Sequence, residues 1–350
     1  MTPATTFTRL LMYWHRTLNR REMPWKGERD PYRVWLSEVI LQQTRVEQGR
    51  AYYERFLAAF PTLSDLAAAP DDEVFKAWEG LGYYSRCRNL LSTARFIMET
   101  LGGSFPTTHE GILALRGVGP YTAAAIASFA FGLPHAVVDG NVIRVLARYD
   151  GIREAVDRPE VRRNLTARAQ DLLDRSDPAG FNQAIMDFGA TVCRPRSPAC
   201  GACPLSEYCQ ARAAGQVDSI PAKAPKPGRK VRWLHYIHAE HGEHTLVRER
   251  TGKDIWRHLN EFWLVETPSP LSDAELAALP LLHNLPTAGL PQLSEAFRQQ
   301  LTHQEIRGRF VRVMLSHRIP APEGFRWLGQ AAMASAPFPK FILTYLQNCR

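Results

Sequence analysis

Four cysteines lie close together near the middle of the chain, at Cys193, Cys200, Cys203 and Cys209. Their spacing is C-x6-C-x2-C-x5-C, and the other two cysteines, Cys87 and Cys349, lie far away. Four thiolates in so short a stretch can surround one metal centre. Such a ligand set suits an iron–sulfur cluster or a structural zinc ion, and the spacing alone leaves both open.

Two carboxylates in the first half of the chain suit acid–base chemistry. Glu38 lies in the apolar run V-W-L-S-E-V-I-L, where a helix would place it on an apolar face. Loss of hydration there raises the pKa of a carboxyl group, which suits a general acid near neutral pH. A buried structural ion pair is an equal alternative. Asp139, in V-V-D-G-N-V, is placed to cap a helix at a groove between helices.

A glycine-rich turn, G-V-G-P-Y-T-A, begins at Gly117 and joins two helical stretches. Gly117 and Gly119 allow a tight turn and close approach of another backbone. Pro120 opens the next helix, whose first amides face outward and can bind a phosphate oxygen. An ordinary helical hairpin is the alternative, but the flanking I-L-A-L-R-G-V-G and the Ala-rich helix that follows favour DNA binding.

The elements around these residues indicate a helical domain followed by a mixed one. Helical spacing predicts helices over 32–47, 48–59, 64–68, 71–79, 85–101, 108–114, 121–131, 142–149, 158–176 and 178–192. Alternation then predicts strands over 231–238, 245–249, 262–265 and 309–315, with helices over 273–278, 291–300 and 340–347.

The domain boundary is expected where the composition changes. The stretch I-P-A-K-A-P-K-P-G-R-K-V-R, residues 220–232, holds prolines and basic residues and no acidic one. It predicts a semi-rigid basic linker over 217–231, between an all-α domain over 1–216 and a smaller α+β domain over 232–350. The helical hairpin would span 112–131 and the cysteine loop 193–209.

The net charge of the chain indicates the class of molecule that it binds. The chain has 350 residues and a net charge of +8, which favours a polyanion such as nucleic acid. No signal peptide and no long apolar run is evident, so we expect a cytoplasmic, nucleoid-associated protein that does not enter a membrane. Disulfides are not expected in that reducing compartment, and clustered cysteines there indicate metal ligands.

The hairpin followed by four cysteines resembles the endonuclease III superfamily of base-excision DNA glycosylases, in which the cysteines hold a [4Fe-4S] cluster. A closer resemblance, over residues 23–209, is to the A/G-specific adenine DNA glycosylases, the MutY family. It is carried by P-W at 24–25, D-P-Y at 30–32, L-S-E-V-I-L-Q-Q-T at 36–44, G-L-G-Y-Y-S-R at 80–86 and V-D-G-N-V at 138–142.

The resemblance implies base-excision repair by removal of adenine paired with 8-oxoguanine or guanine in double-stranded DNA, by a monomer. It implies that Glu38 protonates the N7 atom of adenine, and that Asp139 stabilises the sugar cation or traps it covalently. Tyr121 and Asn141 match positions that support the cation and orient water. Bifunctional relatives carry a lysine where this chain has Tyr121, so a glycosylase without efficient lyase activity is expected.

The same resemblance assigns residues that bind DNA and the extruded base. Positions matching the adenine pocket are Trp25, Lys26 and Asp187, although many relatives carry Arg and Glu at the last two. Positions matching DNA contacts are Gln42, Gln43, Tyr83, Arg86, Gly117 and Gly119.

The second domain is expected to resemble a Nudix hydrolase that reads 8-oxoguanine. Thr302 and His303 resemble the family's F-S/T-H loop, although Leu301 replaces the aromatic residue. The glutamate run R-E-x-x-E-E of an active Nudix enzyme is missing from the sequence, so pyrophosphohydrolase activity is not expected.

Two other functions remain open at this stage. One is an endonuclease III-like glycosylase/lyase for oxidised pyrimidines, against which Tyr121 and Glu38 count. The other is a non-catalytic iron–sulfur DNA-binding protein, against which the joint presence of Glu38, Asp139, Tyr121 and Asn141 counts.

Overall fold

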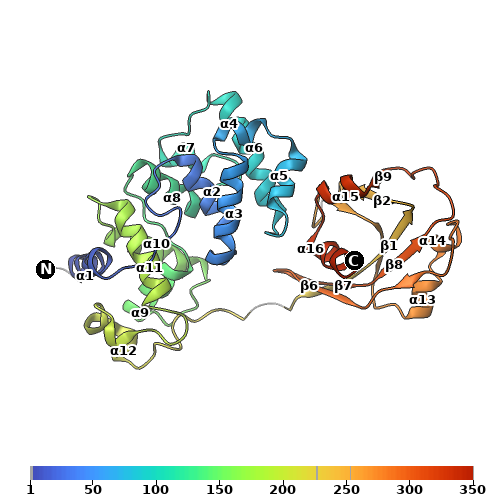
Figure 1. The fold of residues 1–350 in the computed structure, drawn as a ribbon. Coiled ribbons are helices and arrows are strands. Elements are labelled where there is room, and N and C mark those ends of the chain that lie inside the picture. Colours follow the sequence, from blue (N-terminus) through green and yellow to red (C-terminus); the bar gives the residue numbers. More distant parts are fainter. Residues whose placement is uncertain (1–2, 226–227, 253, 350) are drawn as a thin grey trace. The chain divides into compact units, whose positions relative to one another are not determined.

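The computed structural model describes residues 3–225, 228–252 and 254–349. The chain divides into two compact units (Figure 1). The first comprises Met1–Ala68 and Asn89–Lys226, and the second comprises Ala69–Arg88 and Pro227–Arg350. The predicted linker over 217–231 includes residues 226 and 227, which lie outside the described residues. No helix in the described part of the chain is long and apolar enough to cross a membrane.

The described part of the first unit is helical. Its long helices are α1 (Pro3–Thr17), α2 (Pro31–Leu41), α3 (Val46–Ala59), α8 (Pro120–Phe131), α9 (Gly140–Tyr149), α10 (Pro159–Leu172) and α11 (Pro178–Thr191). Shorter ones are α4 (Leu63–Ala68), α7 (His109–Leu113), α12 (Gln210–Ala213) and the 3-10 turns Cys200–Ala202 and Ser206–Tyr208. The division between the units falls within α6 (Tyr84–Thr100), and α5 (Asp71–Trp78) belongs to the second unit.

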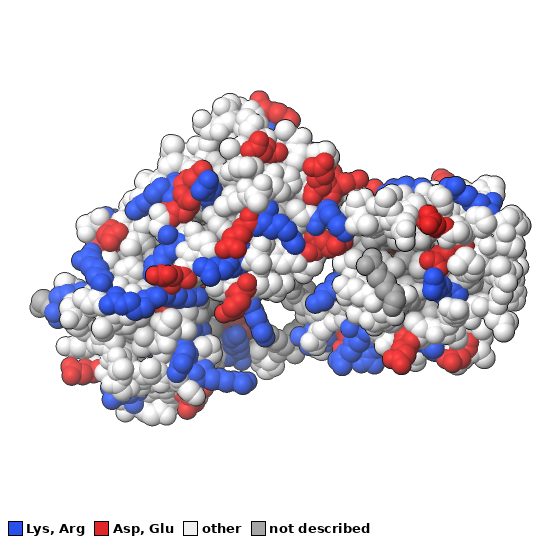
Figure 2. Space-filling model, in the orientation of Figure 1, with Lys and Arg blue, Asp and Glu red and all other residues white. Residues whose placement is uncertain are grey.

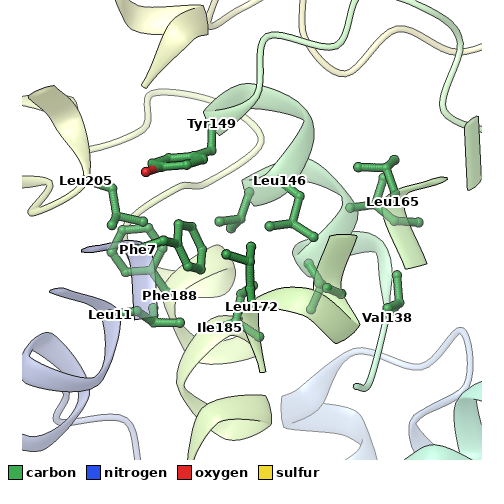
Figure 3. Close-up of a cluster of buried hydrophobic side chains, with 14 of the residues drawn as sticks. Phe7, Leu11, Val138, Leu146, Tyr149, Leu165, Leu172, Ile185, Phe188 and Leu205 are labelled. Carbon is green, nitrogen blue, oxygen red and sulfur yellow. The ribbon is translucent and has the colours of Figure 1, made fainter. Parts of the chain in front are cut away.

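One hydrophobic core joins α1, α9, α10 and α11 (Figure 3). Phe7 of α1 meets Tyr149 of α9 edge to face, with ring centroids 4.8 Å apart. Trp14 of α1 meets Phe188 of α11 in the same way at 5.0 Å. Aromatic pairs of this geometry add to the stability that their burial provides. This core fixes α9, and therefore the position of Asp139 at its start.

A second contact, between α2 and α8, brings two of the expected site residues together. The middle of α8 is Ala-rich, and Ala123, Ala125 and Ala127 are fully buried. Small side chains let two helix axes approach closely. The facing helix α2 buries Trp35 and Leu36. Glu38 of α2 and Tyr121 of α8 therefore lie across a short gap.

The helix predicted over 32–47 is interrupted, which corrects the sequence-based boundary. Helix α2 ends at Leu41 with Gln42 as its C-cap, and α3 begins at Val46. Gln43 adopts a positive φ of 58°, a left-handed conformation that a helix cannot continue. The break leaves Gln42 and Gln43 in a turn beside Glu38 instead of within a helix.

The second unit contains one nine-stranded sheet in its described part. Its strands are β1 (Lys230–His241), β2 (His244–Glu249), β3 (Asn260–Glu261), β4 (Trp263–Thr267), β5 (Gln292–Leu293), β6 (Phe297–Gln300), β7 (Gln304–Gly308), β8 (Phe310–Met314) and β9 (Phe325–Gly329). Strand β1 pairs antiparallel with β2 and β4, and parallel with β7 and β8.

Helices cover both faces of this sheet. Helix α16 (Lys340–Asn348) packs on the face that carries Leu234 and Tyr236. Helices α13 (Asp273–Ala277) and α14 (Pro280–His283) pack on the face that carries Ile237 and Ala239. The alternation along β1 follows the period of two of a strand. Helix α15 (Gln330–Ser335) follows β9.

The helix predicted over 291–300 is wrong. The residues form β5 and β6, and β6 pairs antiparallel with β7 from Phe297↔Gly308 to Gln300↔Glu305. Pairing with a neighbouring strand overrides a weak local preference for helix. Gly308, at the end of β7, is required beside β1, because a Cβ there would lie 1.7 Å from the carbonyl oxygen of Leu234.

Candidate active site and iron–sulfur loop

A pocket of about 550 Å³ opens in the first unit between α2, α8, α9, α11 and the segment after α1. Its lining includes the four residues that the sequence assigns to catalysis, two of those it assigns to the base pocket and two of those it assigns to DNA contacts, namely Glu38, Tyr121, Asp139 and Asn141, then Trp25 and Lys26, then Gln42 and Gln43. Residues far apart in the sequence thus share one cavity. The structure brings the two carboxylates to the same pocket, as the motifs predict.

Glu38 is the carboxyl group whose surroundings disfavour charge. Its side chain is buried, with the residue 6% exposed. Loss of hydration raises its pKa to about 7; a hydrogen bond with Tyr121 opposes the rise, and the negative charge of Asp139 adds to it. Burial and the neighbouring acids also raise the pKa of the Tyr121 hydroxyl well above its usual value. Glu38 can therefore hold and release a proton near neutral pH.

Asp139 is held in one position by the start of α9. The backbone amides of Asn141 and Val142 each donate to its Oδ1 atom at 2.8 Å. The side-chain Nδ2 of Asn141 donates to its Oδ2 atom at 2.7 Å. This is an N-cap with an additional side-chain donor, so the expected capping role and a place in the pocket coincide. The environments of Asp139 and Glu38 thus differ: Asp139 accepts three hydrogen bonds at the start of a helix, whereas loss of hydration is the largest influence on Glu38.

Arg144, which sequence reasoning did not single out, ties this pocket to the cysteine loop. Its Nη2 donates to the Oδ1 of Asn141 at 2.8 Å and to the carbonyl of Gly189 at 2.6 Å. Its Nε donates to the carbonyl of Cys193 at 2.8 Å. No local sequence signal identifies such a residue, because Gly189 and Cys193 lie 45 and 49 residues further along the chain. Through Arg144, the carbonyl of Cys193 therefore helps to fix the Asn141 side chain that donates to Asp139.

Lys26, which lines the pocket, forms an ion pair with Asp187, which is not itself among the lining residues. Lys26 Nζ lies 3.1 Å from Asp187 Oδ2, and Arg21 Nη1 lies 2.9 Å from Asp187 Oδ1. Asp187 is fully buried, so both cations compensate a charge that water does not reach. The sequence assigns Lys26 and Asp187 to the base pocket, but of these two only Lys26 lines it; Arg21, which the sequence did not single out, lines it as well. Trp25 closes the same wall and meets Tyr53 edge to face at 5.5 Å.

The glycine hairpin has the geometry that its sequence predicts. Gly117 has a φ of 78°, and a Cβ there would lie 2.5 Å from Cβ of Asn89. Gly119 caps α8 without a side-chain hydrogen bond, and Pro120 is the first helical residue. The amides in the first turn of α8 face an open groove beside the pocket. The lining of this groove includes Gly117, Gly119 and Thr122.

The four cysteines line one small cavity together with Arg148 and Arg212. Burial, together with smaller effects of the other three sulfurs, raises the pKa of the Cys203 thiol to about 11. Within the described residues, no three His, Cys, Asp or Glu side chains converge as a single bound ion requires. The four thiol side chains around this cavity suit an iron–sulfur cluster or a zinc ion, as their spacing in the sequence does.

Arg148 secures the loop that carries these cysteines. Its Nη1 lies 3.4 Å from Cys193 Sγ and donates to the carbonyl of Arg194 at 2.8 Å. Its Nε donates to the carbonyl of Ile220 at 2.9 Å. A buried guanidinium next to thiolates also offsets their negative charge. The cavity is thus lined by donors suited to an anionic cluster.

The remaining predicted residues lie in the second unit. Tyr83 has a positive φ of 49°, and its hydroxyl contacts that of Thr302. Arg86 stacks over the rings of Trp78 and Tyr83, with its guanidinium carbon 5.1 Å and 5.5 Å from their centroids. Thr302 and His303 are exposed in the turn between β6 and β7. The structure therefore brings Tyr83 and Thr302 together, although they are far apart in the sequence.

Comparison with known proteins identifies two matching regions. Residues 36–170 match the HhH-GPD superfamily of base excision DNA repair proteins. Residues 193–209 match the iron–sulfur binding domain of endonuclease III. An iron–sulfur cluster is thus the cofactor that the four cysteines hold, as expected. The first of these matches includes the hairpin, Glu38, Tyr121 and Asp139.

Among full sequences, the chain is 44% identical over 230 residues to the adenine DNA glycosylase of Rattus norvegicus, covering 62% of this chain and 44% of the relative. The chain therefore spans less than half the length of this relative. It is 32% identical over 257 residues to the adenine DNA glycosylase of Buchnera aphidicola subsp. Baizongia pistaciae, covering 72% of each chain.

Solved structures share the fold of the helical unit. A thermostable thymine-DNA glycosylase aligns with a TM-score of 0.55 and 30% identity over 60% of this chain and 97% of the other. A non-covalent endonuclease III–DNA complex aligns with a TM-score of 0.52 and 22% identity over 61% of this chain and 99% of the other. The second likeness shows the fold alone.

The raised pKa of Glu38 predicts a pH-dependent effect of Glu38→Gln on stability. A folded-state pKa of about 7, above the ordinary 4.5, means that folding takes up a proton between these values. The free energy of unfolding then falls as pH rises through this window, because the unfolded chain releases a proton that the folded chain retains. Glutamine does not ionise, so Glu38→Gln and the parent chain should unfold at similar urea concentrations at about pH 5. At about pH 8 the variant should be more stable than the parent chain by roughly 3 kcal/mol.

Glu99→Gln is the matched control, because Glu99 is exposed on α6 and lies outside the pocket. It should change stability little at either pH. A Glu38→Gln variant whose stability relative to the parent is the same at both pH values would show that Glu38 ionises as an ordinary carboxyl group.

The cysteine cavity predicts a metal content that depends on its ligands. The purified chain should carry about four iron atoms, and Cys203→Ser should lose most of them because one cluster ligand is missing. Cys349→Ser should keep them, since Cys349 is exposed and lies outside the cavity. Elemental analysis measures iron and zinc together. One zinc and no iron per chain would contradict the assignment.

Proposed function

The chain belongs to the adenine DNA glycosylase family, and from this membership we propose that it removes adenine from mispairs by hydrolysing the N-glycosidic bond of an extruded nucleotide. The observation that carries the proposal is the pair of carboxylates in one pocket. Glu38 is buried with a raised pKa, and Asp139 is held by three hydrogen-bond donors. Two carboxyl groups in such different states suit acid catalysis and cation stabilisation on one substrate.

Glu38 acts first as the general acid. Adenine is a poor leaving group, and protonation at its N7 weakens the bond between the base and the sugar. A pKa of about 7 lets Glu38 hold that proton at neutral pH and give it up to the base. Tyr121, hydrogen-bonded to Glu38, orients the carboxyl group.

Asp139 acts on the sugar. As the glycosidic bond breaks, positive charge develops on the sugar, and a nearby carboxylate stabilises it or forms a transient covalent bond. Asn141 holds Oδ2 of Asp139 and is placed to orient the water that completes hydrolysis. Both residues share the pocket with Glu38, so acid and stabiliser act on a single bound nucleotide.

The reaction ends at base removal. A lyase of this superfamily uses a lysine amine to form a Schiff base with the sugar. This chain has Tyr121 at that position, and a phenol cannot form one. The chain is therefore a monofunctional glycosylase, and this residue separates it from the endonuclease III-like alternative.

The pocket wall selects the base once it has left the duplex. Trp25 offers an aromatic surface, and the Lys26–Asp187 pair supplies polar groups. Gln42 and Gln43, in the turn that ends α2, lie at the rim, where they can fill the space that the base leaves. Gly117 and Gly119 approach the phosphates through backbone amides.

The second unit is proposed as a Nudix-like domain that reads 8-oxoguanine on the opposite strand. Thr302 and His303 are exposed in one turn, and Tyr83 reaches Thr302. Together with Arg86 these residues form the proposed contact with the lesion. The substrate is thus double-stranded DNA with 8-oxoguanine:A or G:A mispairs, bound by one copy of the chain.

The decisive experiment is base release from defined duplexes under single-turnover conditions. Duplexes with 8-oxoguanine:A, 8-oxoguanine:C and thymine glycol are each incubated and then analysed with and without alkali. The chain should release base only from the first, and strand cleavage should need alkali. Glu38→Gln should bind the first duplex with near-normal affinity and lose release by at least about a hundredfold, because the acid is missing. Release from thymine glycol, or near-normal release by Glu38→Gln, would overturn the proposal.

The lesion-reading turn has its own test. Thr302→Ala combined with His303→Ala should reduce the preference for 8-oxoguanine:A over G:A, while the rate on G:A stays nearly unchanged. The double variant Ser269→Ala with Ser316→Ala alters exposed positions elsewhere in the second unit and serves as control. Unchanged discrimination by the first variant would argue against this turn.

A further inference from the structure

Arg162 lies where the catalytic pocket and the hairpin groove meet. The two cavities share Gln42, Gln43, Tyr121, Val138 and Arg162 in their linings. Arg162 is the charged member of this shared set. It comes from α10, which carries none of the residues that the sequence assigns to DNA contacts.

The helix presents Arg162 outward. Leu165, Ala169 and Leu172 are buried on the side of α10 that packs into the core. Arg162 is exposed, and Thr166, one turn further along, also lines the groove. Residues four apart share one face of a helix, so these two side chains form one edge of the groove.

The charge of Arg162 is available for a ligand. Arg168, on the same helix, is paired with Asp150 at 3.0 Å. By contrast, within the described ranges no carboxylate pairs with the guanidinium of Arg162. The groove lining contains no other Lys or Arg among the described residues. On the face shown in Figure 2, basic side chains lie among acidic ones.

The two cavities fit the two parts of an extruded nucleotide. The base occupies the pocket with Glu38, and the sugar–phosphate backbone must then pass over the shared rim. The start of α8 lines the groove, and the amides that follow Gly119 suit one phosphate. Arg162 lines the same groove from α10, and its planar guanidinium suits a phosphodiester oxygen in a bidentate contact.

We propose that Arg162 binds a DNA phosphodiester next to the extruded nucleotide, opposite the hairpin amides. The backbone is then held on both sides of the sugar on which Asp139 acts. This subsite rests on the proposed function, because the pocket defines which nucleotide is extruded. Arg162 is a positioning residue: it fixes the backbone, and the carboxylates perform the chemistry.

The test combines charge removal on the protein with charge removal on the DNA. Binding to an 8-oxoguanine:A duplex is measured with Glu38→Gln, which holds the substrate intact, alone and combined with Arg162→Ala, Arg162→Lys or Arg163→Ala. Arg163 is the matched control, because it is an exposed arginine on α10 outside both cavities. A series of duplexes carries one neutral methylphosphonate at successive positions around the adenosine.

Arg162→Ala should weaken binding by about tenfold and lower the slope of log affinity against log salt by about one, while Arg163→Ala changes both little. Arg162→Lys should restore the slope, because the charge is kept. One methylphosphonate next to the adenosine should weaken binding by Glu38→Gln and have little further effect once Arg162 is alanine. Equal behaviour of the two alanine variants, or an unchanged methylphosphonate effect, overturns the subsite.

A parallel release assay separates this subsite from the proposed function. If the parent chain releases adenine and Arg162→Ala binds like Arg163→Ala, the phosphate subsite is wrong and the glycosylase function stands. If the parent chain releases no adenine, the function is wrong whatever Arg162 does. A slower release step with unchanged affinity and salt slope would also overturn the subsite, because it would place Arg162 in the chemistry.

Discussion

The hydrogen bonds at the start of α9 are the constraint on which the active site depends. Asp139 caps this helix through the amides of Asn141 and Val142, and the Asn141 side chain completes the set. Asn141 is in turn held by Arg144, one turn along, which also binds the carbonyl of Cys193. A catalytic carboxylate must stay within a few tenths of an ångström of its place, and here a helix cap and a cluster loop both secure it.

This arrangement gives the iron–sulfur loop a structural role in the first unit. Arg148 lies one turn beyond Arg144 and binds backbone carbonyls on both sides of the loop. Loss of the cluster would release Cys193, and with it one anchor of Arg144. The cysteine loop is therefore linked to Asp139 through α9, while Glu38 depends on a separate contact between α2 and α8. Glu38 and Asp139 are thus positioned by different parts of the core.

Local signals in the sequence predicted much of this site. The cap at Asp139, the glycine turn and the cysteine spacing are short patterns whose chemistry is fixed by neighbouring residues. The end of α2 at Leu41 was missed because nothing in the sequence around Gln43 requires its positive φ. The strand β6 was misread as a helix because only its partner β7 decides its conformation. Arg21 and Arg144 were missed because their partners lie far along the chain.

The contacts of Asp187 with residues far away in the sequence bear on how the proposed pocket would recognise the base. A carboxylate has about four lone-pair positions, and Asp187 already accepts from four donors: Asn19, Arg21, Lys26 and Gln183. It has no acceptor capacity left for the amino group of an extruded adenine. The ammonium of Lys26 uses one hydrogen on Asp187 and one on the carbonyl of Arg21, which leaves one for a ligand. In the proposed function, Lys26 therefore donates to a ring nitrogen of the base, and Asp187 does not accept from the exocyclic amine.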